Sequence, residues 1–156
     1  MKRSLLLAGA ALLLGTAATA QRYLTEVFSG ANITITPDVI YGTNIDFLTS
    51  NLASPDVNAN VTELQTAVTL GNPIPAAYFD PADGSTAVKV TNVRMDVYQP
   101  SQSIDTETER PLVVYIHTGN ALPPPINGSP NGTRKDSCAV ESCTRLAKRG
   151  YVAVSM

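Results

Sequence analysis

The stretch from Pro111 to Met156 decides the fold, because it contains three segments with different hydrophobic periods. "PLVVYI" (111–116) is a continuous apolar run, as expected of a strand covered on both faces in a parallel sheet. "DSCAVESCTRLAKRG" (136–150) has helical spacing, and "YVAVSM" (151–156) reads as a second buried strand. Strand, helix and strand in this order predict a right-handed βαβ unit and therefore an α/β fold.

The helix between the two strands is predicted over residues 137–149, with parallel neighbours at 112–116 and 151–155. Asp136 can cap its start, Glu141 and Arg145 form a favourable i,i+4 pair, and Gly150 suits the position after its end. Its apolar face is expected to contain Ala139, Val140, Cys143, Leu146 and Ala147.

Upstream, the pattern predicts further strands. "NITITPDVIYG" (32–42) is strand-prone, and Pro37 favours an edge strand or two short strands. In "NVRMDVYQP" (92–100), Val93, Met95 and Val97 alternate with more polar residues, which indicates a half-buried strand. "NVTELQTAVTLG" (60–71) fits either a short helix or a strand, and "SQSIDTETER" (101–110) a charged surface connection.

The N-terminus has the three parts of a cleaved secretory signal. Lys2 and Arg3 precede the apolar run Leu5–Leu14, and Ala18-Thr19-Ala20 forms a small-residue cleavage site. Ten apolar residues are too few to cross a bilayer. We therefore expect a signal peptide over 1–20, a secreted or periplasmic protein, and no membrane span after cleavage.

The remaining chain, residues 21–156, suits one small domain. It has nine basic and thirteen acidic residues, a formal charge of −4, so nucleic acid is not an expected partner. Cys138 and Cys143 lie five residues apart, a spacing that fits neither a redox pair nor a zinc pair. On one helix they point away from each other, which predicts a partly buried free thiol at Cys143 and an exposed or differently paired Cys138.

About nineteen residues, His117 to Lys135, separate the first strand of the βαβ unit from its helix. An ordinary βα connection has roughly two to six residues, and α/β folds place ligands at the carboxyl ends of parallel strands. Pro123, Pro124 and Pro125 lack the N–H groups that a phosphate site needs, and no glycine-rich phosphate motif occurs. The loop is therefore the candidate site, for a ligand other than phosphate.

Four segments in order, "DVIYG", "VRMDVYQP", "RPLVVYIHTGN" and "LAKRGYVAVSM", resemble the N-terminal part of an α/β-hydrolase of the secreted esterase or lipase kind. The resemblance covers roughly residues 38–43 and 93–156, and region 44–90 is an insertion of uncertain structure. It implies a truncated α/β-hydrolase fold, in which antiparallel N-terminal strands lead into the parallel βαβ unit. It also implies a carboxylesterase activity of the parent protein on a small-molecule ester or acyl substrate, and no cofactor or metal.

The family's H-G-G-G motif corresponds to His117, Thr118, Gly119 and Asn120. The resemblance implies that the backbone N–H groups of Gly119 and Asn120 form the oxyanion hole and that His117 and Thr118 anchor the loop. Two of the family's glycines are replaced, by Thr118 and Asn120. Asn tolerates the left-handed region better than most residues, whereas Thr does not.

No catalytic triad is expected within this chain. The family's order is Ser, then Asp or Glu, then His, so a histidine before any nucleophile is out of place. No G-x-S-x-G occurs, and Ser155 lies in an apolar strand. Because an apolar strand at the end would leave an unprotected sheet edge, we expect an inactive fragment whose nucleophile lies downstream.

Two other functions stay open. The chain could belong to a non-enzymatic secreted binding protein of the same fold, in which Thr118 and Asn120 mark a decayed oxyanion hole. An unrelated β-rich binding module would leave the βαβ pattern unexplained.

Overall fold

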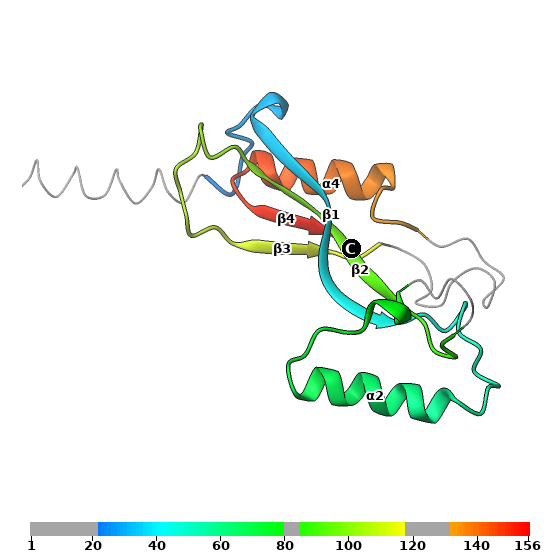
Figure 1. Cartoon of the computed structure of the whole chain (residues 1–156). Coiled ribbons are helices and arrows are strands. Elements are labelled where there is room, and N and C mark those ends of the chain that lie inside the picture. Colours follow the sequence, from blue (N-terminus) through cyan, green and yellow to red (C-terminus); the bar gives the residue numbers. More distant parts are fainter. Residues whose placement is uncertain (1–21, 80–84, 118–131) are drawn as a thin grey trace, which may run out of the picture. The chain divides into compact units, whose positions relative to one another are not determined.

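The computed structural model describes residues 22–79, 85–117 and 132–156 (Figure 1). In chain order the elements are η1 (Gly30–Asn32), β1 (Ile33–Ile45), α2 (Val57–Thr69), η2 (Ala76–Tyr78), β2 (Val90–Pro100), β3 (Leu112–Tyr115), α4 (Ser137–Lys148) and β4 (Val152–Ser155). The strands form a mixed four-stranded sheet in the order β1-β2-β4-β3. The chain divides into two compact units. Unit 1 consists of Met1–Val39 and Met95–Met156, and unit 2 consists of Ile40–Arg94.

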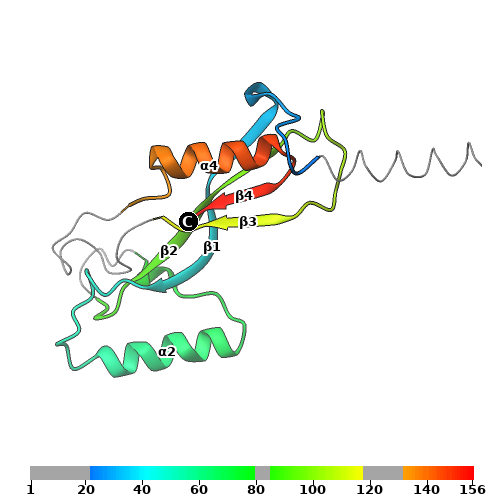
Figure 2. The same ribbon diagram turned by 180° about the vertical axis from the view of Figure 1, so that it is seen from behind.

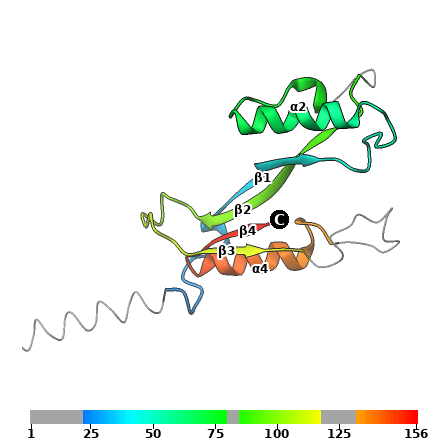
Figure 3. The ribbon, with the colours of Figure 1, turned by 90° about the horizontal axis from the view of Figure 1, so that it is seen from below.

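The predicted βαβ unit is confirmed. β3 and β4 pair in parallel, with Val113 opposite Ala153 and Tyr115 opposite Ser155. Figures 2 and 3 both show α4, the connection between them, running alongside these two strands. β2 pairs with β4 in the antiparallel direction, which gives the sheet its mixed character.

The backbone and side-chain hydrogen bonds at the two ends of α4 fix where the helix stops and starts. Tyr151 N–H donates to Leu146 O (3.2 Å) and Gly150 N–H to Ala147 O (2.9 Å), with Gly150 at a φ of 95°. These two bonds form a Schellman motif. The motif places residue 150 in the left-handed region, where glycine, which has no Cβ, is not strained. At the other end Asp136 is the N-cap residue, but its side chain makes no capping bond. That expected bond is wrong, because the carboxylate instead accepts from Thr133 N (2.9 Å) and Thr133 Oγ1 (2.8 Å).

Unit 1 has its core between α4 and one face of the sheet. Its fully or nearly fully buried members are Tyr98, Cys143, Ala147 and Ala153. Leu112 and Ile116, on the other face of β3, are 62% and 72% exposed. The expectation that 111–116 is covered on both faces is therefore wrong for the described residues, because α4 packs on one face of the sheet only.

The strand in 92–100 is confirmed, but its buried face is the opposite of the one that alternation suggested. Asp96, Tyr98 and Pro100 are buried, while Val93, Met95 and Val97 are partly exposed. Tyr98 packs against Cys143 and Ala147 of α4, so contact with the helix decides which face is inside.

β1 is an edge strand, as Pro37 predicted, and it continues through the proline. Asp38 has a φ of 58°, the one positive φ of a residue other than glycine in the described ranges. Aspartate enters this left-handed region at lower cost than most residues. The local turn of the backbone directs Asp38 N–H to Asp96 Oδ1, at 2.9 Å.

Unit 2 contains α2, a helix in the region where the sequence fitted either a helix or a strand. α2 ends at Thr69, Leu70 is its C-cap residue, and Gly71 follows with a φ of 70°. The core of this unit consists of Leu64, Tyr78, Val88 and Val90. Tyr78 Oη donates to Glu63 Oε2 at 2.5 Å. Burial first, and then the hydrogen bond and charge of Glu63, raise the pKa of Tyr78 to about 12.

Candidate functional site

The carboxyl ends of β3 and β4 place His117 next to the last residue of the chain. Met156 N–H donates to Tyr115 O (3.0 Å), and His117 N–H donates to Met156 O (3.4 Å). The parallel ladder thus continues one step beyond β3 and fixes the backbone at His117. Thr118, Gly119 and Asn120, the other predicted site residues, lie outside the described residues.

A buried carboxylate lies on β2, on the other side of β4 from β3. Asp96 is 4% exposed and is paired with Ser155 in the β2–β4 ladder. Its Oδ1 accepts from Arg134 Nε at 3.1 Å and from Asp38 N at 2.9 Å. Removing a carboxylate from water is costly, and the guanidinium and the N–H group together offset this cost.

Arg134 is held from three sides. Its guanidinium also binds the Asp38 carboxylate, and its backbone oxygen accepts from Ser155 Oγ at 2.8 Å. Ser155 is fully buried, so this hydroxyl acts as a structural donor. The chain is therefore tied to β4 just before residue 118 through His117 and again at Arg134. His117 and Arg134, which flank the residues that the structure does not describe, are thus both fixed at the carboxyl end of β4.

Two pairs of polar side chains lie close to these anchors along the chain, Thr133 with Asp136 and Tyr115 with Cys138. Hydrogen bonds from Thr133 N–H and the Thr133 hydroxyl, with a smaller contribution from the charge of His117, lower the pKa of Asp136. Tyr115 Oη donates to Cys138 Sγ at 3.7 Å. This bond, and then the charge of Cys138, raise the pKa of the Tyr115 phenol.

The two cysteines are free, Cys138 exposed and Cys143 buried, as their spacing predicted. Burial first, and then the negative charge of Asp96, raise the pKa of the Cys143 thiol to about 11. Cys143 is therefore protonated and unreactive at neutral pH, because the thiolate is the nucleophilic form. Its place is in the core between α4 and the sheet.

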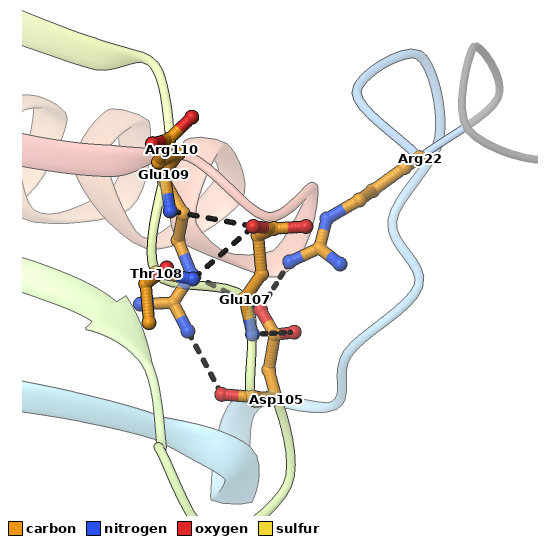
Figure 4. Close-up of polar contacts among 6 residues, drawn as sticks. All are labelled: Arg22, Asp105, Glu107, Thr108, Glu109 and Arg110. Carbon is orange, nitrogen blue, oxygen red and sulfur yellow. Dashed lines mark hydrogen bonds and ion pairs between the residues drawn. The ribbon is translucent and has the colours of Figure 1, made fainter.

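A second ion-pair cluster lies in the connection between β2 and β3, which the sequence suggested to be a charged surface segment (Figure 4). The side chains of Asp105 and Arg110 are only 7% and 5% exposed, so that description is wrong for these two side chains. Asp105 Oδ2 accepts from Arg110 Nε (3.1 Å) and from Arg22, and Arg110 also donates to Asp105 O (2.9 Å). Burial raises the pKa of Asp105, but the Arg22 hydrogen bond and the two positive charges bring it below its ordinary value.

Sequence reasoning missed the residues that form the two ion-pair clusters. Asp96 was assigned to the exposed positions of an alternating strand, and Asp38, Arg134 and Asp105 were not singled out. One signal was present: Asp96 lies within the strand-like segment "NVRMDVYQP", and a charged residue that is buried in a strand is usually paired.

The described residues contain no group of three or more His, Cys, Asp and Glu side chains that could hold a metal ion. Among the helices of these ranges, none is both long and apolar enough to cross a membrane. In comparisons with known proteins, the chain matches no family model, no curated protein and no solved structure.

Proposed function

We propose that this chain carries the oxyanion-hole side of a secreted serine ester hydrolase of the α/β-hydrolase fold. The observation that carries the proposal is the position of His117, which lies two residues after β3, at the carboxyl ends of the two parallel strands of the βαβ unit. Ligand sites of α/β sheets lie at this end of the strands. The H-T-G-N segment that begins here is the part of the sequence that resembles the family's oxyanion loop.

In this proposal Gly119 and Asn120 donate their backbone N–H groups to the oxygen of the tetrahedral intermediate, where negative charge develops. Asp96 and Ser155 hold Arg134, and the ladder to Met156 holds His117, so the loop is fixed on both sides. The substrate is a small carboxylic ester or related acyl compound. The 156 residues contain no G-x-S-x-G, so the nucleophile is supplied by sequence outside them.

The test uses the product of the whole reading frame that encodes this chain, exported and purified. It should hydrolyse an activated short-chain ester, and a fluorophosphonate should label one serine outside residues 1–156 and abolish turnover. Gly119→Val should lower kcat by about 10²–10³ with little change in KM. A residue with a branched Cβ cannot turn its N–H into the site without strain, so one oxyanion donor is misdirected in the transition state.

His117→Asn is the matched variant at the neighbouring position. It should lower thermal stability and leave measurable turnover, since His117 anchors the backbone in this proposal. Absence of any labelled serine, or full kcat in Gly119→Val together with no turnover in a folded His117→Asn protein, would contradict these roles.

A further inference from the structure

Unit 2 contains a cavity that the proposed ester hydrolase does not use. Its volume is about 310 Å³, and it lies between α2, the end of β1 and the start of β2. Six apolar side chains line it: Ile45, Val61, Leu64, Val68, Ile74 and Val90. Leu64 and Val90 belong to the buried core of the unit, so the cavity opens directly onto that core.

The lining determines the charge of the molecule that fits. The polar lining residues are Thr43, Asn44, Gln65 and Thr69, which carry hydroxyl and amide groups, and no lining residue is charged. A charged ligand would lose hydration here without gaining a counter-charge. All four polar residues are exposed, so they surround the mouth and can bond one polar group of a ligand.

The volume of the cavity determines the size of the molecule that fits. An apolar cavity of about 150 Å³ binds benzene, so about twice that volume accepts a two-ring aromatic or an aliphatic chain of similar bulk. The part of α2 that lines the cavity, residues 61–69, is about 12 Å long. A stable protein interface needs about 800 Å² on each partner, which a site of this length does not offer.

We propose that this cavity is a binding site for a small, uncharged, mainly apolar molecule of about naphthalene size with one polar group. The ligand places its apolar body against Leu64 and Val90 and its polar group next to Gln65. The proposal is independent of the ester hydrolase, because every residue that it uses lies in unit 2.

The test uses prodan, a neutral naphthalene dye with one carbonyl group whose emission shifts to the blue in apolar surroundings. Titrated with the purified chain, it should bind saturably with one site per chain. 1-Naphthol should displace it, and 1-naphthalenesulfonate should not, because the cavity offers no positive charge. Displacement by both compounds alike, or a shift that does not saturate, would overturn the proposal.

Two matched variants of α2 place the site. Gln65→Phe fills the mouth and should weaken prodan binding by about tenfold or more. Thr66→Phe adds the same ring at the next residue, which is exposed and outside the lining, and should leave binding within about twofold of wild type. Equal effects of the two variants would assign the dye to another surface. Should Gln65→Phe fail to fold, Val68→Trp serves, because Val68 lines the cavity and is 66% exposed.

Discussion

The two units of this chain form their cores in different ways. In unit 1, α4 contacts the sheet through small side chains, and Ala139, Cys143, Ala147 and Ala153 are all fully buried. In unit 2, the core consists of four larger residues, and an open cavity of about 310 Å³ remains beside them. Small residues allow a helix to approach a sheet closely, and this close contact leaves no space for a larger side chain. Unit 2 keeps such space and is the part of the chain suited to hold a small molecule.

The units also differ in their carboxylates, and this difference should give the largest effect on stability. Asp96→Ala should lower the free energy of unfolding by about 3 kcal/mol, because it leaves Arg134 without its buried partner. Asp46→Ala in unit 2 removes an exposed carboxylate that accepts bonds from Leu48 N–H and from Thr49, and should cost less than about 1 kcal/mol.

Urea unfolding of both variants, followed by circular dichroism, measures this comparison. Asp96→Asn keeps the shape of the side chain and serves as the control. It should lower the free energy of unfolding by less than Asp96→Ala does. Similar losses in Asp96→Ala and Asp46→Ala would show that the buried cluster adds no special stability to unit 1.

Packing gives the next effect. Ala147→Leu inserts three carbon atoms into the closed contact of α4 with the sheet and should cost about 2 kcal/mol through displaced neighbours. Val61→Leu adds one carbon next to the cavity of unit 2 and should change stability by less than about 0.5 kcal/mol. The melting temperatures of the two variants decide between a closed and an open core. A larger loss in Val61→Leu would reverse the comparison.

The smallest expected effects on stability depend on pH. One falls at acid pH and the other at alkaline pH. The lowered pKa of Asp105 stabilises unit 1 above the ordinary value of 3.8, and this stability is lost as the pH falls through the lowered value. The raised pKa of Tyr78 stabilises unit 2 below pH 10, and this contribution is lost as the pH rises towards about 12.

Asp105→Asn should therefore flatten only the acid side of a plot of unfolding free energy against pH, and Tyr78→Phe only the alkaline side. Absorbance of the phenolate at 295 nm should show the late titration of Tyr78 directly and lose it in Tyr78→Phe. An alkaline limb that is the same in Tyr78→Phe and in wild type would contradict the assignment of this group.

Prediction from sequence succeeded where one segment carried several signals of the same element. In 136–150 the apolar spacing, the Glu141–Arg145 pair (2.6 Å) and Gly150 all indicated one helix, and α4 follows them. In 60–71 two readings remained, because α2 buries only Leu64 and Ala67 and its pattern of burial is weak. At the candidate site, the position of His117 followed from the strand before it. The buried pairing of Asp96 with Arg134 did not, because the two residues are 38 positions apart.

The sequence by itself determined the order of strand, helix and strand between 112 and 155, because hydrophobic period and helix-end residues act over a few neighbouring positions. It also determined that Cys138 and Cys143 stay apart, because five residues of helix turn them to different sides. Only the tertiary structure decided which face of β2 is buried, which carboxylates are paired with arginine, and where a cavity remains. These features depend on side chains brought together from distant parts of the chain, and local propensity carries no information about such partners.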